Sequence, residues 1–271
     1  MCGLFFIRYF VFSLLFTVHV NAVTAEQRLT LTGSSTVAPL ALEIAKRFEQ
    51  LHPGTRIDVQ SGGSSRGIAD ALAGRVNIGM ASRSLKPEET LVAHTIARDG
   101  IGMIVHRDNP MVALSDAQII AIYTGEITSW SGVGGNDQAI TVVNKAEGRS
   151  TLELFCLHFT LTNPQIKAHV VIGDNEQGIK TVAGNPQAIG YVSIGTAQVS
   201  IDAKIPIRLL PMAGITPSTD AVRTGTWPLA RPLNLVTKGN PTGLAADFIT
   251  FAMSKEVDDL ITDLAFVPPT R

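Results

Sequence analysis

Three short stretches of this chain share one order: strand-like residues, then a Gly/Ser/Thr segment, then residues with helical spacing. They lie at residues 33–39, 61–67 and 147–153. At such a junction the first backbone amides of the helix lack partners within the helix and carry partial positive charge, and hydroxyls beside them complete a cradle for an oxyanion. One junction is weak evidence, because Ser and Thr cap most helices. Three such junctions in one chain predict helix N-termini that converge on a bound dianion, which the protein binds without catalysing a reaction.

The local chemistry of these junctions suits helix starts. Thr36 is expected as the N-cap of the first helix, and Pro39 falls in its first turn, where a missing amide hydrogen costs nothing. At the third junction, Ser150 and Glu153 have the spacing of a capping box. Each of these residues therefore has a purely structural interpretation beside the ligand-binding one.

The N-terminus has the pattern of a secretory signal peptide. Residues 4–20 are mostly apolar, with Arg8 as their only formal charge. Small residues follow, so cleavage is expected after Ala22 or Ala25, and a membrane anchor is the competing interpretation. The remaining residues, 26–271, are enough for two lobes of ordinary size.

Composition excludes some classes of function. The chain has 22 Lys and Arg against 23 Asp and Glu, a balance that gives no support for nucleic-acid or polybasic membrane binding. Cys2 lies in the predicted signal peptide, so Cys156 remains alone and is interpreted as a small core residue of a helix. No metal or other cofactor is expected, because the histidines lack ligand spacing. After the signal peptide they stand at His52, His94, His106, His158 and His169.

Strand-like and helical segments alternate with short loops, which predicts an α/β fold with a largely parallel sheet. Apolar runs at residues 101–105 and 233–236 are expected to cross into a second lobe and to return. In such sheets ligands bind outside the carboxyl ends of the strands, where the polar loops fall. The expected division is a signal peptide at residues 1–25, a first lobe formed by residues 26–104 and 225–271, and a second lobe at residues 105–224.

Other local signals refine this picture. Ser115 and Gln118 have capping-box spacing ahead of a helix, and Gly125 suits its C-terminal end. Trp130 lies in a loop-like segment, and packing under this loop is favoured over a role as a partner-facing aromatic. The last helices are expected at about residues 244–253 and 256–264, where they would cover the first lobe.

With these residues in view, the chain resembles the periplasmic phosphate-binding component of ABC transporters, the PstS-like branch of the type II periplasmic binding proteins. The resemblance implies two α/β lobes joined by a hinge and a cleft that closes on dehydrated inorganic phosphate. It also implies a monomeric periplasmic protein, without enzymatic activity, that delivers phosphate to an inner-membrane permease. The likeness is carried by residues 33–39, 62–68, 78–84, 100–110, 124–130, 147–151, 186–193 and 231–238.

Carried over residue by residue, the resemblance implies ligand-binding residues at the three junctions: Ser35, Thr36, Ser64, Lys145, Arg149, Ser150 and Thr151. Ser65 and Arg83 are added as candidates, with Arg83 expected either to contact the anion or to face solvent.

Three positions depart from the family's pattern. Lys145 replaces an arginine, and a lysine is a point charge rather than a bidentate fork. Arg149-Ser150-Thr151 stands in place of Ser-Gly-Thr, which adds a charge near the anion. Arg83 stands where an aspartate accepts the proton of bound phosphate. The ligand is therefore expected to be phosphate first, with another tetrahedral oxyanion as the alternative.

Two functions of other classes stay open. Residues 63–67 fit G-x-S-x-G, the nucleophile elbow of α/β-hydrolases, with Ser65 as nucleophile and His158 or His169 as base. Too few strands precede this motif, however, and neither histidine has a catalytic context. A secreted sensor or interaction protein could keep the same fold, and its partner binding would not depend on the anion.

Overall fold

The computed structural model describes residues 26–270, so the predicted signal peptide, its cleavage site and the competing anchor lie outside the described residues. The strands are β1 (Gln27–Gly33), β2 (Thr55–Ser61), β3 (Ile78–Ala81), β4 (Val92–His106), β5 (Thr141–Lys145), β6 (Val170–Ile172), β7 (Ala188–Ser193), β8 (Ile207–Leu210) and β9 (Ala230–Thr237). The helices are α1 (Ala38–Leu51), α2 (Ser64–Leu72), α3 (Asp116–Thr124), α4 (Ser150–Phe159), α5 (Asn175–Ala183), α6 (Ile194–Asp202), α7 (Thr219–Thr224), α8 (Gly243–Ala252) and α9 (Asp258–Asp263). Short 3-10 turns lie at η1 (Trp130–Val133), η2 (Asn163–Gln165) and η3 (Lys255–Val257). In this part of the chain no helix is long and apolar enough to cross a bilayer.

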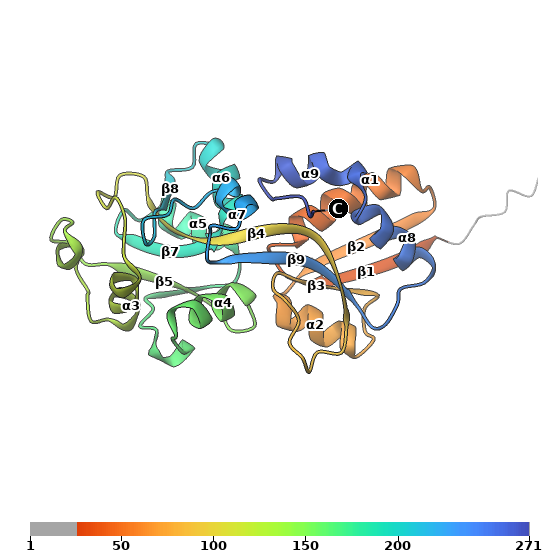
Figure 1. The fold of residues 1–271 in the computed structure, drawn as a ribbon, viewed down its shortest axis with the longest axis horizontal. Helices are drawn as coiled ribbons and strands as arrows, with labels where there is room; N and C mark the ends of the chain where they lie inside the picture. The colour runs from red at the N-terminus through yellow and green to blue at the C-terminus, as the bar shows by residue number, and fades with distance from the viewer. Residues whose placement is uncertain (1–25, 271) are drawn as a thin grey trace, which may run out of the picture.

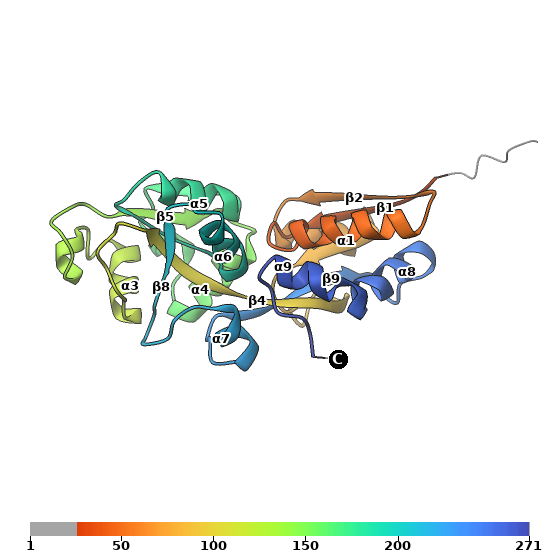
Figure 2. The ribbon, with the colours of Figure 1, turned by 90° about the horizontal axis from the view of Figure 1, so that it is seen from above.

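The elements form two groups joined by two long strands (Figure 1). We call β1, α1, β2, α2, β3, α8 and α9 the first half, and α3, β5, α4, β6, α5, β7, α6, β8 and α7 the second half. Only β4 and β9 run through both groups, and the view from above shows them along one side of the gap between the ribbons (Figure 2). The predicted crossings at residues 101–105 and 233–236 lie in these two strands, which form the hinge. The lobe boundaries predicted at 104/105 and 224/225 remain an interpretation, because β4 is unbroken across the first of them.

The sheet order is β2-β1-β3-β9-β4-β7-β5-β6, with β8 also paired to β4. Pairing is parallel within each half, between β1 and both β2 and β3 and between β5 and both β6 and β7. Every pair that involves a hinge strand is antiparallel. The prediction of a largely parallel sheet was therefore right within the halves and wrong at the hinge. The reason is that β4 leaves the first half and β9 returns to it, so the two must run in opposite directions.

Each half has its own apolar core. In the first half, α1 buries Ile44 and Phe48 against the sheet and against Phe248 of α8. Figures 1 and 2 both place α8 and α9 beside α1, as expected for the last helices. In the second half, Phe155 of α4 stacks on Tyr191 of β7, with ring centroids 4.0 Å apart. Each half therefore has a core of its own, the arrangement that hinge closure between two bodies requires.

Some predicted details hold. Pro39 lies in the first turn of α1, and Ser115 with Gln118 forms a complete capping box on α3, which ends at a left-handed Gly125. Trp130 is buried, and its indole nitrogen donates to the carbonyl oxygen of Gln187 at 3.2 Å. Cys156 is half-buried and packs against the core of the second half.

Two predicted caps were wrong. The N-cap of α1 is Val37 rather than Thr36, because the hydroxyl of Ser34 accepts from the amides of Thr36 and Val37. At α4 the N-cap is Arg149, and Ser150 is already helical, so it makes no capping bond. The hydroxyls of Thr36 and Ser150 are thereby released from the backbone and have other partners.

Candidate functional site

The helix α2 begins unusually close to the sheet because glycines face each other there. A Cβ on Gly67 would lie 2.5 Å from the carbonyl oxygen of Thr32 and 2.8 Å from that of Met80, too close for any side chain. The first turn of α2 thus lies against the ends of β1 and β3. The prediction placed residues 61–67 in a loop, whereas Ser64 to Gly67 form this first turn. The amide end of α2 consequently points at the gap between the halves.

The three junctions meet at one small pocket. Its lining comes from the segment before α1, the start of α2, the end of β3 and the start of α4: Ser34, Ser35, Thr36, Gly63, Ser64, Ser82, Arg149, Ser150 and Thr151. Six of the predicted ligand residues are therefore together: Ser35, Thr36, Ser64, Arg149, Ser150 and Thr151. Residues from both halves contribute, so the pocket exists only where the halves meet. It is rich in hydroxyls and helix N-termini, which suits an anion.

Buried hydroxyls of the two halves hydrogen-bond one another across this pocket. The hydroxyl of Ser150 lies 2.6 Å from that of Ser82 and accepts from Ser64 at 3.1 Å. Ser34 donates to Ser82 at 2.8 Å. The halves are thus in contact, with each hydroxyl satisfied by another. Since hydroxyls can turn to donate elsewhere, an anion's oxygens can replace these bonds with charge-assisted ones.

A buried arginine on a hinge strand completes the hydroxyl cluster. Arg231 of β9 is 2% exposed and pairs with Asp99 of β4, which is equally buried. Its Nη1 donates to Thr151 at 3.0 Å, and its Nη2 donates to Thr36 at 3.2 Å. The guanidinium therefore binds hydroxyls from both halves at once.

Lys145 is close to the pocket but does not line it. Its Nζ donates to the carbonyl oxygen of Asp174 at 2.8 Å and to Oδ1 of Asn175 at 3.1 Å, and Asn175 in turn donates to Thr36. Burial, with the nearby charge of Arg231, lowers the pKa of Lys145 to about 7. Its charge near neutral pH thus depends on what binds beside it.

Two further predicted residues lie away from the pocket. The guanidinium of Arg83 forms two hydrogen bonds to Glu89, and its Nε lies 2.9 Å from Oε2 of Glu153. The Ser65 hydroxyl donates to Oε1 of the same Glu153 at 3.0 Å. Glu153 is on α4, whereas Arg83, Glu89 and Ser65 are in the first half or on the loop after β3. These contacts tie the halves together beside the pocket.

A larger groove, about 620 Å³, lies along this second set of contacts. Its lining is mainly apolar, with Leu154, Leu157 and Pro232 beside Arg83 and Lys86. We place the anion site in the smaller pocket instead, because hydroxyls and the N-termini of α1, α2 and α4 converge there, whereas the groove is lined mainly by apolar side chains.

Sequence reasoning missed several residues of the site. Ser34 and Ser82 carry no motif beyond Gly/Ser-rich loops, although each directly follows a strand, the position that favours a ligand contact. Asn175 is in the first turn of α5 and has no motif either. Arg231 appeared only within a segment of family likeness, and its pairing with Asp99, 132 positions earlier, has no local signal.

The geometry gives the hydrolase alternative no support. The hydroxyl of Ser65 donates to a glutamate, while the His158 ring lies near Asp116 and the His169 ring accepts from the amide of Val142. Within residues 26–270 no group of three or more His, Cys, Asp or Glu side chains could hold a metal ion.

Comparison with known proteins identifies the family. A family model described as a PBP superfamily domain matches residues 20–256. The phosphate-binding protein PstS of Bacillus subtilis is 31% identical over 252 residues, which cover 91% of this chain and 82% of that protein.

Two solved structures are similar over whole chains. A phosphate ABC transporter substrate-binding protein from Clostridium perfringens, with bound phosphate, is 30% identical with a TM-score of 0.83, covering 90% of this chain and 100% of that one. An ABC-type phosphate transport receptor from Vibrio cholerae is 32% identical with a TM-score of 0.74, covering 89% and 100%. These matches confirm the predicted fold class, and the chain belongs to the PstS family of phosphate-binding proteins within the PBP superfamily.

Proposed function

We propose that this chain is a periplasmic solute-binding protein that captures inorganic phosphate between its two halves and delivers it to the permease of an ABC importer. The observation that carries this proposal is the convergence of three helix N-termini with the hydroxyls of Thr36, Ser64 and Thr151 on one pocket. Those groups come from both halves of the chain. The relatives named above are phosphate-binding proteins, which supports phosphate as the first ligand to test.

Binding would exchange one set of hydrogen bonds for another. The anion's oxygens take the donors that the hydroxyls of Ser64, Ser82 and Ser150 now give one another. Helix N-termini and nearby cations offset the anion's charge as water is removed. Because the donors belong to both halves, the closed arrangement binds the anion best, and closure on the ligand follows. No covalent step is required.

Calorimetric titration of the purified protein with phosphate, sulfate, arsenate and molybdate tests this function. Phosphate should bind most tightly. Ser64→Ala and Thr151→Ala should each weaken binding by about 1–3 kcal/mol, because a ligand oxygen loses its donor. Ser84→Ala, an exposed hydroxyl outside the pocket, is the matched control. Unchanged affinity in both pocket variants would refute the assignment.

A second candidate ligand is a fully ionised tetrahedral oxyanion such as sulfate. The observation that favours it is the surroundings of Asp99, the carboxylate paired with Arg231 beside the pocket. Its Oδ2 accepts from Arg231 and its Oδ1 accepts from the amide of Gly195, so it is engaged on both oxygens. Phosphate keeps a proton near neutral pH and needs an acceptor for it, whereas sulfate does not. Equal affinity for sulfate and phosphate in the same titration would favour this candidate.

A further inference from the structure

We propose that Arg231 is a direct, two-pronged ligand of the bound oxyanion, so that a hinge strand supplies charge-assisted donors to the site. This inference rests on the proposed function. The guanidinium of an arginine presents parallel N–H groups that match two oxygens of a tetrahedral anion. In the structure, the two terminal nitrogens of the Arg231 guanidinium point toward the hydroxyl cluster.

Both terminal nitrogens of Arg231 face the residues that line the pocket. Nη1 donates to Thr151 at 3.0 Å and lies 3.4 Å from the hydroxyl of Ser82, and Nη2 donates to Thr36 at 3.2 Å. These hydroxyls belong to α4, to the end of β3 and to the segment before α1. An oxyanion held by them lies within reach of both prongs, and each hydroxyl can instead donate to the ligand.

The other side of the guanidinium is fixed by Asp99. Nε and Nη2 donate to Oδ2 at 3.2 and 2.9 Å, while Oδ1 accepts from the amide of Gly195 at the start of α6. Arg231 and Asp99 are direct cross-strand partners in the β4–β9 pair. The pairing holds the fork in one orientation and lowers the cost of burying its charge. An arginine does not deprotonate, so this charge stays at the pocket at every ordinary pH.

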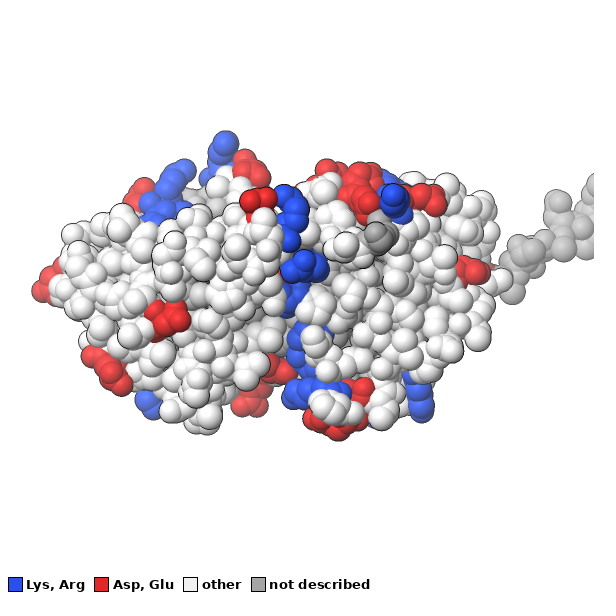
Figure 3. Space-filling view, viewed as in Figure 1, with Lys and Arg blue, Asp and Glu red and all other residues white. Residues whose placement is uncertain are grey.

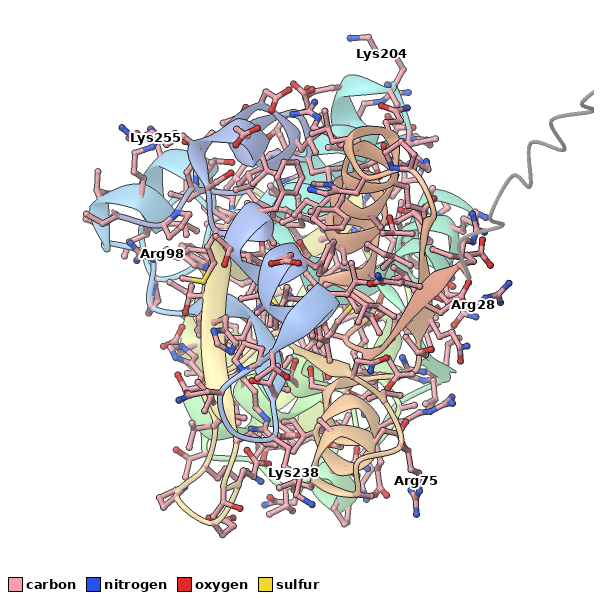
Figure 4. The ribbon with its side chains drawn as sticks, turned by 90° about the vertical axis from the view of Figure 1, so that its right-hand side faces the viewer. Arg28, Arg75, Arg98, Lys204, Lys238 and Lys255 are labelled. Atoms are coloured by element: carbon pink, nitrogen blue, oxygen red, sulfur yellow. The ribbon has the colours of Figure 1, made fainter. Side chains whose placement is uncertain are left out.

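The position on the hinge distinguishes Arg231 from the other cations. Arg149 and Lys145 belong to the second half, whereas Arg231 lies on a strand shared by both halves. Lys and Arg also form a line on the surface along the boundary between the halves, on the face of the hinge strands (Figure 3). Arg98 of β4 points outward there (Figure 4), while Arg231 is buried beneath. Arg98 therefore offers a matched control with the same charge on the same hinge.

The test compares variants of the full mature chain by calorimetric titration with inorganic phosphate, alongside thermal unfolding without ligand. Replacing Arg231 alone would leave Asp99 buried and unpaired, so the variant is the double change Asp99→Asn with Arg231→Gln. We expect at least about a tenfold loss of affinity, the value of one charge-assisted contact. Arg231→Lys keeps the charge without the fork and should recover part of that loss. Arg98→Gln should bind like the wild type.

The outcomes separate this inference from the proposed function. If the wild type binds no oxyanion, the proposed function fails. If the wild type binds and the double variant binds within about twofold of it, Arg231 is only a structural clamp and this inference is overturned. Should the double variant not fold, Arg231→Lys decides: weaker binding with an unchanged unfolding midpoint supports the inference, and unchanged binding overturns it.

Discussion

The carboxylate of Glu153 contacts residues across the boundary between the two halves, with Lys86 at 3.9 Å as the longest of its ion pairs, and its removal should loosen the closed arrangement. From α4 in the second half, Oε1 accepts from the hydroxyl of Ser65 and Oε2 lies 2.9 Å from Nε of Arg83. Both partners belong to the first half or its adjoining loop. Glu153→Gln keeps the size of the side chain but removes its charge and replaces one acceptor oxygen with an NH2 donor, so it can accept from only one of Ser65 and Arg83. The change therefore tests the interlobe ion pair rather than packing.

The size of this effect depends on how buried the ion pair is and on which contacts Arg83 keeps in the variant. The side chain of Arg83 is 6% exposed and that of Glu153 is 29% exposed, so the pair lies between a surface ion pair and a buried one. Arg83 keeps two hydrogen bonds to Glu89, the main cause of its raised pKa, so it is not left as an isolated buried charge. We expect a loss of about 1–2 kcal/mol in the closed arrangement, or roughly a 5–30-fold shift toward the open one.

Small-angle X-ray scattering measures how open the protein is without ligand, and calorimetry measures its affinity for phosphate. Without ligand, Glu153→Gln should increase the radius of gyration, and its phosphate affinity should fall by up to the same factor, since closing then costs ligand-binding energy. Glu88→Gln removes a nearby exposed carboxylate and is the control for net charge. An unchanged radius of gyration together with an unchanged affinity would show that this pair does not hold the halves together.

Two further predictions concern Lys145 and Gly63. The pKa of Lys145 is about 7 in the folded chain and near 10.5 in the unfolded one, so between these pH values the unfolded chain binds more protons. The free energy of unfolding should therefore rise with pH from 7 to 10. Lys145→Met should flatten that rise in denaturant titrations, and an identical slope would contradict the low pKa. A Cβ on Gly63 would lie 2.6 Å from the carbonyl oxygen of Gly148 in the other half, so Gly63→Ala should weaken phosphate binding as well as stability. Gly74 also has a positive φ, and a Cβ there would meet nothing within 4 Å, so Gly74→Ala should reduce stability alone, by about 1 kcal/mol. Equal phosphate affinities in the two variants would argue against closure at Gly63.

The junctions could be predicted from sequence because their signals are local. Glycine, hydroxyl residues and a following apolar period all lie within about ten positions, and each junction was found where the pocket has its lining. The exact cap was less predictable. Ser34 and Thr36 are both plausible caps by residue type, and the choice was made by Ser82, whose hydroxyl accepts from Ser34 and fixes it near the amides of α1.

The charges of the site could not be assigned from local sequence. Arg83 was predicted at the anion, but Glu89 and Glu153 engage its guanidinium beside the groove. Arg231 was not singled out, because its role depends on the register that sets it opposite Asp99 across the hinge. Such long-range pairing is decided by how the strands align, and no motif of either segment reports it.

The way each cation is held suggests an order of events in binding. Arg149 is half-exposed and belongs to the second half, so it moves away from the first half when the cleft opens. Lys145 is buried, and burial together with the nearby charge of Arg231 lowers its pKa to about 7, so an anion bound beside it would favour its charged form. Arg231 differs from both, because it lies on β9, a strand that the two halves share, and its guanidinium faces the hydroxyls of the pocket. An anion can therefore meet Arg231 and the hydroxyls of one half before closure, and the other half then completes its coordination.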